Sequence, residues 1–421
     1  MEPWIALAVF AITYGAIASD RVDRTLAALL GGAVVILAGI ITQETAFAAV
    51  DWNVIFLLFG MMVIAGVMRR TGVFGWLAIR TVRLARGEPL AILLLLAGIT
   101  ALLSAFLDNV TTIVLLVPVT LYIATTLRLS PIPFILAEVL ASNIGGTATL
   151  IGDPPNILIG SAAGLTFADF LANLTPVIIL VFVGFAAAMA VIFRGQMTVA
   201  PEVREAVLAI DDSEFISDHR LLRISVLVLA LTITGFLFAS VIHQQPATIA
   251  LLGAVVLLLV TRLEPEELIR EVDWSTLLFF VGLFVLVEGL VATGVITALG
   301  TELVKITGGD QAVTTLGLLW VSGVASAFVD NIPYTATMIP VVEQLGASGL
   351  EIEPLWWALA LGACLGGNAT IIGASANVVA ANAVARAGHP ITFGRFLRIG
   401  GLVAVMSLLI SSVYVWLRYL V

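Results

Sequence analysis

The stretch Ser104-Ala105-Phe106-Leu107-Asp108-Asn109 recurs 222 positions later as Ser326-Ala327-Phe328-Val329-Asp330-Asn331. Both copies lie inside long apolar stretches, where an ionisable side chain is costly and usually functional. Asp51-Trp52 reappears at the same offset as Asp273-Trp274. These matches predict that one structural unit occurs twice in the chain.

We predict the two repeats to cover residues 1–194 and 220–421, with residues 195–219 as a cytoplasmic linker between them. Duplicated membrane halves with matching interrupted hydrophobic segments are the best sequence-level pointer to a secondary transporter and its solute site. The duplication therefore directs attention to the interrupted segments.

Composition excludes a soluble domain. Hydrophobic residues make up 61% of the chain, charged residues 11%, and the mean hydropathy is +1.14; such values are typical of proteins that span membranes. The sequence has no basic stripe that would indicate nucleic-acid binding. The single cysteine, Cys364, excludes an intrachain disulfide and a cysteine-based metal site, and we expect no cofactor and no metal.

The apolar runs predict the membrane topology. Two broken runs, 131–165 and 354–387, are interrupted by Gly, Asn and, in the first, Pro. The repeated hexapeptide lies at the centre of two long runs, 90–127 and 312–343, which we predict to be re-entrant hairpins of two half-membrane helices each. Eight uninterrupted runs remain, near 4–18, 25–42, 53–68, 174–193, 221–242, 247–261, 275–295 and 397–419. The predicted fold is an all-α polytopic membrane protein with two inverted-topology repeats, each of five membrane-crossing helices and one re-entrant helical hairpin.

The basic residues predict the orientation. Five crossings per repeat invert the second copy relative to the first. Placing Arg21 and Arg24 in the cytoplasm then puts 17 of the 19 basic residues there and leaves only Lys305 and Arg418 outside. We therefore predict a multi-pass protein of a bacterial inner membrane with both termini outside the cytoplasm. The N-terminal run 4–18 is interpreted as a retained helix rather than a signal peptide.

The linker 195–219 contains Pro201, Asp211-Asp212, Glu214 and Asp218, and it is the longest polar segment. We interpret it as a solvated connection. The alternative is a docking site for a cytoplasmic partner such as an ATPase.

The hairpin tips carry the first set of candidate site residues. A helix that begins in mid-membrane directs unpaired backbone N–H groups toward its surroundings. Asp and Asn are also favoured N-caps, so a purely structural capping role is the alternative. Both roles are compatible, and we predict that the tips surround a solute or ion site. Its residues are Asp108, Asn109, Thr111, Thr112, Asp330, Asn331 and Thr335.

The broken helices carry the second set. Glycines and, in the first copy, two prolines prevent a regular helix. The alternative to a binding loop is a glycine-rich interface where helices pack closely. Two matched interruptions favour a solute-binding loop in each copy. The residues are Asn143, Gly145, Gly146, Thr147 and Thr149 in the first copy, and Gly367, Asn368, Thr370, Ser375 and Asn377 in the second.

Three more acidic residues lie within apolar runs: Asp153, Glu138 and Glu288. Since no histidine is predicted in the membrane, a proton pathway has to use such carboxylates. Each of the two glutamates is interpreted either as a proton carrier or as a hydrogen-bonded structural carboxyl. An aspartyl protease pairing Asp153 with Asp108 is disfavoured by the duplication and by Pro154-Pro155, so we do not expect an enzyme.

At these motifs the chain resembles the ion transporter superfamily, and in appearance it is similar to the arsenite/antimonite efflux permeases and the melanosomal P protein group. The resemblance covers essentially the whole chain. It implies a scaffold domain and a moving transport domain made of hairpins and broken helices, and homodimers are common in that superfamily.

Related divalent-anion/sodium symporters carry Ser-Asn-Thr at the tips, whereas this chain carries Asp-Asn. Two carboxylates repel a dicarboxylate unless they are protonated or paired with a cation. They suit a neutral hydroxylated solute with proton coupling, or a cation such as sodium. The helix N-termini at the tips have the opposite preference, because their backbone N–H groups favour an anionic solute.

The preferred hypothesis is proton-coupled efflux of arsenite and antimonite by alternating access. Asn109, Asn331, Thr149 and Thr370 would contact the solute, while a tip aspartate exchanges protons. The alternatives are a sodium/proton antiporter of the same fold, then an anion or dicarboxylate symporter. A membrane anchor without transport activity and an ion channel are further alternatives.

Overall fold

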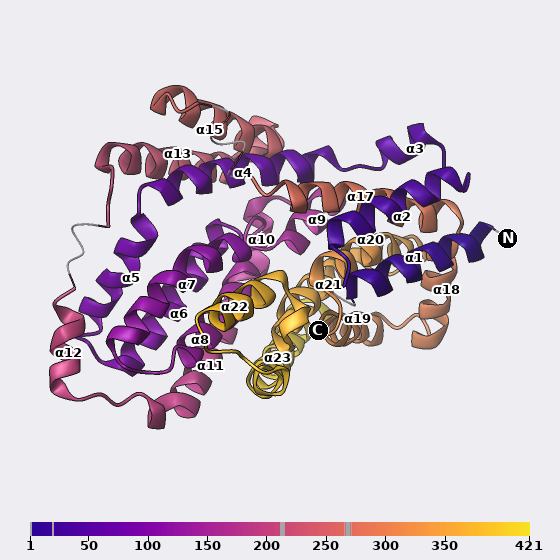
Figure 1. Cartoon of the computed structure of the whole chain (residues 1–421). Helices are drawn as coiled ribbons and strands as arrows, with labels where there is room; N and C mark the ends of the chain where they lie inside the picture. The colour runs from indigo at the N-terminus through magenta and orange to yellow at the C-terminus, as the bar shows by residue number, and fades with distance from the viewer. Residues whose placement is uncertain (1, 19–20, 211–214, 265, 267–269, 271) are drawn as a thin grey trace.

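The computed structural model of the chain describes residues 2–18, 21–210, 215–264, 266, 270 and 272–421, and the described residues are almost entirely helical (Figure 1). The first half contains α1 (Glu2–Ala18), α2 (Arg24–Leu37), α3 (Gln43–Ala48), α4 (Trp52–Arg70), α5 (Val73–Leu84), α6 (Pro89–Phe106), α7 (Asn109–Thr126), α8 (Ile132–Gly146), α9 (Pro154–Ala163), α10 (Phe167–Asn173) and α11 (Thr175–Phe193). The second half contains α13 (His219–Leu237), α14 (Ala239–Ile242), α15 (Pro246–Thr261), α17 (Trp274–Ala292), α18 (Val295–Thr307), α19 (Gln311–Ser326), α20 (Asn331–Ala347), α21 (Ile352–Gly366), α22 (Ser375–Arg386) and α23 (Phe393–Val415), which continues as a π-helix over Trp416–Leu420.

The two halves repeat the same order of elements. Helices α1, α2, α4 and α5 correspond to α13, α15, α17 and α18, and α6 through α9 correspond to α19 through α22. The recurring Asp-Trp pair has a local explanation, because Asp51 caps α4 through the N–H groups of Asn53 and Val54, and Asp273 caps α17 through that of Thr276. A carboxylate at the N-cap satisfies helix N–H groups that have no partner within the helix.

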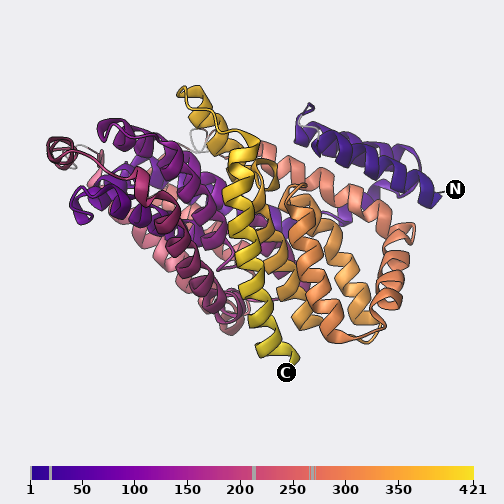
Figure 2. The ribbon, with the colours of Figure 1, turned by 90° about the horizontal axis from the view of Figure 1, so that it is seen from below.

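Helices of each half pack along helices of the other half. Helix α2 of the first half packs along α17 of the second, and α4 of the first packs along α15 of the second (Figures 1 and 2). Reciprocal contacts of this kind are what an approximate two-fold relation between two copies produces. They fit the predicted duplication, and the inverted orientation in the membrane stays a prediction.

The structure confirms a helical membrane protein. Among the described residues, seven helices are long and apolar enough to cross a membrane, or up to eight if the bent pair α9–α10 counts as one span. The hairpin helices α6 and α7 have 18 residues each, about 27 Å at 1.5 Å per residue, and are longer than the predicted half-membrane length. Length alone therefore allows them to be spans as well as hairpin arms.

Burial separates a central layer from an outer one. Every residue of α8 is buried, as are residues 354–366 of α21. The outer helices α13 and α15 instead expose large apolar side chains such as Leu231 and Leu259. An apolar exterior around a closely packed polar centre is expected for a protein surrounded by lipid.

The linker begins with a 3₁₀ turn (Arg194–Gln196) and contains a short helix, α12 (Pro201–Leu208). Its described parts contact the first half: Arg204 pairs with Glu88, and the Ser217 hydroxyl donates to the Arg70 carbonyl at 2.7 Å. Residues 211–214, which include the predicted acidic positions Asp211, Asp212 and Glu214, lie outside the described residues.

Candidate functional site

The repeated hexapeptide forms the two hairpin tips. Helix α6 ends at Phe106, and Asp108 caps α7 by accepting the Thr111 N–H at 2.8 Å. In the second copy, Asp330 caps α20 by accepting the Ile332 N–H at 3.0 Å. Each tip aspartate therefore has the capping role considered as the alternative, which leaves its remaining oxygen available for other contacts.

The recurrence of serine in the hexapeptide and of threonine in the broken helix has a shared structural cause. In the first half, the Ser104 hydroxyl donates to the Ser142 carbonyl at 2.7 Å, and the Thr149 hydroxyl donates to the Ala105 carbonyl. In the second half, Ser326 donates to the Ala363 carbonyl at 2.6 Å, and Thr370 donates to that of Ala327. We call each set of two bonds a tip clamp. The two clamps hold each hairpin tip on its own broken helix.

The glycines of the broken helices allow close packing. A Cβ atom added to Gly145 would lie 2.0 Å from the Ala101 carbonyl oxygen, and one added to Gly366 would lie 2.3 Å from that of Gly323. Both contacts are with backbone atoms, which cannot move aside as a flexible side chain can. The predicted ligands Gly146 and Gly367 likewise lie against the returning loops and are fully buried.

Predicted asparagine ligands bind one another in the centre of the molecule. The Asn109 amide donates to Asn143 Oδ1 at 3.1 Å, and Asn143 donates to the side-chain oxygens of Asn368 and Asn377, both at 2.9 Å. All four side chains are buried. This amide network joins the two halves, and in this conformation its members line none of the cavities described below.

The loops that break the helices are held by asparagines as well. Asn377 donates to the carbonyls of Gly367 and Thr370, both at 2.8 Å. Asn156 makes the equivalent bonds to the carbonyls of Thr147 and Thr149, at 3.1 and 2.8 Å. A side-chain amide thus replaces the missing helical hydrogen bonds in each copy.

The second tip has a different central partner from the first. The Asn331 amide lies 3.2 Å from both carboxylate oxygens of Asp153, which is fully buried. Cys364 occupies the position that Asn143 has in the first copy, and its sulfur lies 3.6 Å from Asn156 Oδ1. Asp153 is close enough to both Asp108 and Asp330 for their charges to interact.

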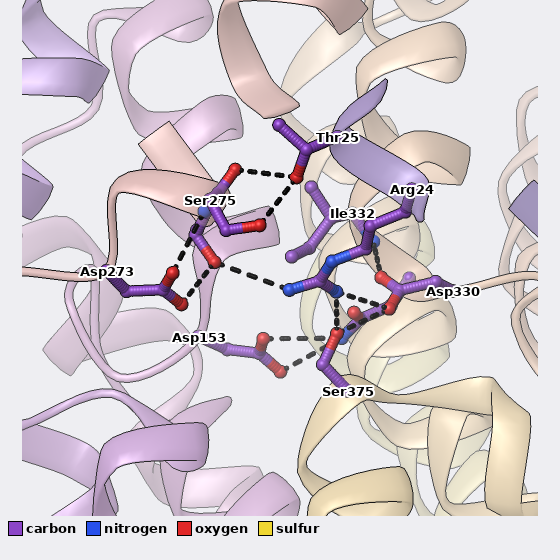
Figure 3. Close-up of polar contacts among 10 residues, drawn as sticks. Arg24, Thr25, Asp153, Asp273, Ser275, Asp330, Ile332 and Ser375 are labelled. Carbon is purple, nitrogen blue, oxygen red and sulfur yellow. Dashed lines mark hydrogen bonds and ion pairs between the residues drawn. The ribbon is translucent and has the colours of Figure 1, made fainter. Parts of the chain in front are cut away.

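A charged cluster forms beside the second tip (Figure 3). Arg24, the first residue of α2, reaches Asp330 Oδ2 at 3.4 Å and also contacts the Ser375 hydroxyl. Ser375 donates to the same Asp330 oxygen at 2.6 Å. The second guanidinium nitrogen lies 3.3 Å from the Thr276 hydroxyl, and that hydroxyl donates to Asp273 at 2.7 Å. Arg24 therefore connects the hairpin tip, the broken helix and the start of α17.

The charged cluster borders a cavity of about 300 Å³, at the lower end of the roughly 300–1,000 Å³ typical of small-molecule sites. Its polar wall consists of Asp23, Arg24, Asp273, Asp330 and Ser375. The rest of the wall is apolar: Ile17, Val110, Phe279, Phe328, Val329, Ile372, Val378 and Val379. We call this space the charged cavity.

A second cavity, of about 340 Å³, occupies the equivalent place in the other half. Gln245 and Pro246 stand where the charged cavity has Asp23 and Arg24, and Asn53 and His243 also line the wall. We call it the amide cavity. Its wall does not include Asp108, whereas the wall of the charged cavity includes Asp330.

The remaining predicted residues are less central. Glu138 on α8 is fully buried and accepts a hydrogen bond from the Thr120 hydroxyl at 2.6 Å. Thr120 lies about 17 Å along α7 from the hairpin tip, so Glu138 is distant from the tip as well. Glu288 lies about 21 Å along α17 from its start, so the structure does not bring it to the tips. The Thr112 and Thr335 hydroxyls are buried without a partner among the described residues, and Thr147 donates to the Asn143 carbonyl at 2.7 Å.

Sequence reasoning missed Arg24 and Asp273 as site residues, because it used the first only for topology and the second only as a marker of the repeat. A signal was present for Arg24. It lies directly before the apolar run 25–42, and Pro246 replaces it in the second copy. A charge that only one copy carries is a sign of specialisation.

The fold and its polar centre define a membrane transporter. The structure resembles that of the YdaH transporter from Alcanivorax borkumensis, with a TM-score of 0.60, 18% identity and coverage of 99% of this chain and 97% of the other, which shows the fold alone. The chain belongs to the citrate transporter family, CitMHS, whose sequence profile matches residues 14–362.

Relatives agree with this assignment. The chain is 47% identical to the 46 kDa membrane protein of Mycobacterium leprae and 46% identical to the uncharacterized transporter Rv2684 of Mycobacterium tuberculosis, each over 99% of both chains. It is 35% identical to the human P protein over 99% of this chain and 60% of that protein. The predicted relation to the ion transporter superfamily is confirmed, and the chain is a multi-pass membrane protein.

Proposed function

We propose that the protein is a secondary-active transporter that moves a small carboxylate, with citrate as the first candidate, by alternating access and in exchange for or together with protons. The carrying observation is the asymmetry of the two cavities: the wall of the charged cavity includes Asp330 of the second hairpin tip, whereas the wall of the amide cavity does not include Asp108 of the first. In alternating access the two repeats take different positions around one central site, so cavities that reach the two tips unequally support this mode of transport.

Arg24 supports a carboxylate as the solute. A guanidinium group offers a planar pair of N–H donors that matches a carboxylate, and Ser375 adds a hydroxyl beside it. The family description, citrate transporter, supports the same solute class.

The carboxylates of the charged cavity support the coupling. Asp23, Asp273 and Asp330 share the cavity wall with one guanidinium, so a bare anion would meet an excess of negative charge. A proton bound by a carboxylate near the cavity, or a cation carried with the solute, would reduce that repulsion. We therefore propose that protons bind when the solute binds.

Uptake into proteoliposomes tests the proposal. Radiolabelled citrate, with and without Mg²⁺, is offered to vesicles containing the purified protein, with an imposed pH gradient of either direction. We expect uptake above that of empty vesicles and a rate that changes with the gradient. Citrate uptake equal to that of empty vesicles under every condition contradicts the carboxylate assignment.

The second candidate is efflux of arsenite and antimonite, which the sequence motifs suggested. The tip aspartates favour it, since a neutral trihydroxide can donate hydrogen bonds to a carboxylate without charge repulsion. The two amides expected to hold that solute have other partners: Asn109 belongs to the amide network, and Asn331 donates to Asp153. Arsenite in the same vesicles separates the two candidates, and sodium-dependent proton flux without either solute would indicate the antiporter.

A further inference from the structure

The two tip aspartates have the same sequence context but different partners. Asp330 accepts from Arg24 and Ser375. At the equivalent places in the other half stand Pro246 and Pro154, neither of which carries a side-chain donor. Asp108 accordingly has no Lys or Arg partner in the part of the chain that the structure describes, and its side chain accepts the Thr111 N–H.

The surroundings of Asp108 are apolar. It borders a small space of about 10 Å³, roughly the volume one water molecule needs, and the other walls are aliphatic or thioether side chains. Those walls are Leu58, Met61, Met62 and Ala65 of α4, Leu107 of the tip, and Ile151 and Ile157 of the broken helix. A charge in such a place is costly unless a proton or a cation accompanies it.

The charged groups that face Asp108 from other elements are acidic. Asp273 at the start of α17 and Asp153 at the start of α9 are both within electrostatic range. They increase the cost of a negative charge on Asp108. Arg24, the one cation of the central cluster in Figure 3, is engaged by Asp330 and Ser375.

We propose that the two tip aspartates, Asp108 and Asp330, have different roles in transport, which we call the division of work. Asp330 is the fixed partner of Arg24 and forms part of the solute site. Asp108 is the coupling residue: its carboxylate binds one proton, becomes a neutral carboxylic acid, and releases that proton to the other side during the cycle. This inference rests on the proposed function and names the residue that carries its proton.

The position of Ile157 indicates the route of release. Its side chain lines both the small space beside Asp108 and the amide cavity. Solute bound at Arg24 faces the charged cavity, whereas Asp108 borders a space that shares Ile157 with the amide cavity. A shift of α9 would open Asp108 toward the amide cavity.

Two transport modes separate coupling from solute binding. Counterflow exchanges labelled for unlabelled citrate and needs no net proton movement, whereas accumulation driven by a pH gradient does. For Asp108→Asn we expect counterflow within about twofold of the wild type and a loss of accumulation of at least tenfold. Asp330→Asn and Arg24→Gln should lose both modes in the same proportion.

The substitutions have matched controls. Asp108→Ser and Asp330→Ser keep a good N-cap without a titratable group, so they test the same point if an asparagine variant does not fold. Asp51→Asn removes a carboxylate from the N-cap of α4 and should leave both modes unchanged. The pH dependence of counterflow is a further readout, because it should flatten in Asp108→Asn and Asp108→Ser alone.

The outcomes are distinguishable. If Asp108 variants lose both modes equally, or if Asp330→Asn alone uncouples them, the division of work is wrong while the transporter proposal stands. If the wild type exchanges neither citrate nor arsenite, the proposed function fails and the division fails with it.

Discussion

The two hairpin tips share a hexapeptide and a clamp, yet their central partners differ. In both halves a serine and a threonine hold the tip to the broken helix through backbone carbonyls. In the first tip, Asn109 joins the amide network through Asn143. In the second tip, Asn331 donates to Asp153, and Asp330 forms an ion pair with Arg24. After duplication, the bonds that hold the backbone stayed alike, and the partners of the charged and amide groups diverged.

The glycine contacts should be indispensable in both halves. Gly145→Ala and Gly366→Ala place a Cβ against a backbone carbonyl, and we expect each to cost more than about 3 kcal/mol and to prevent recovery of monodisperse protein. Gly317→Ala, where a Cβ meets nothing within 4 Å, is the control and should be neutral or slightly stabilising. Gel filtration of detergent extracts measures all three. Normal behaviour of either broken-helix variant would show that the close packing can relax.

The amide network should distinguish the halves. Asn143→Ala leaves buried amide groups without partners and should cost about 2–4 kcal/mol. Cys364→Ala, at the equivalent position, removes one weak contact and should cost about 1 kcal/mol. Unfolding in SDS, followed by fluorescence of the eight tryptophans, gives both values. Equal losses would mean that the network contributes little.

Tyr14 stabilises the second tip alone. Its hydroxyl contacts the Pro333 carbonyl and the Thr337 hydroxyl, and the equivalent residue in the other half is Phe236. Tyr14→Phe should therefore cost about 1 kcal/mol in the same unfolding measurement. Tyr122→Phe, at an exposed position, should cost almost nothing. If the two substitutions have the same effect, the hydroxyl contact is not a stabilising one.

The tip clamps should be equivalent. Ser104→Ala and Ser326→Ala each remove one side-chain hydrogen bond to a buried carbonyl, and each should cost about 0.5–1.5 kcal/mol. The double variant should cost about the sum, since the two sites share no partner. A several-fold difference between the single variants would show that the clamps have diverged as well.

The sequence predicted the repeated order of elements, the broken helices and the positions of the hairpin tips, because each of these leaves a local pattern. Prolines and glycines break a helix wherever it packs, and a repeated motif is visible without a structure. The hairpin arms match the predicted run 90–127, and at 18 residues each they are as long as full spans, so the re-entrant arrangement stays a prediction.

Partners distant in the chain were not predictable in the same way. Asn143 meets Asn368 and Asn377 more than 200 positions away, so the predicted solute ligands satisfy one another in a manner that no spacing reveals. Arg24 lies directly before an apolar run, where a basic residue is ordinarily a topology signal. Its partner Asp330 is brought to it by the packing of the two halves.

The packing of helices from one half against the other has a consequence for biosynthesis. Thr25 on α2 bonds Ser275 on α17, and 250 residues of chain separate them. At about 5–20 residues per second, roughly 10–50 s pass between the synthesis of the one and of the other. During that interval α2 lacks α17, the helix along which it packs in the native structure, so the nascent first half needs lipid or an insertion factor to shield the uncovered face. Native assembly becomes complete only after the second half has left the ribosome.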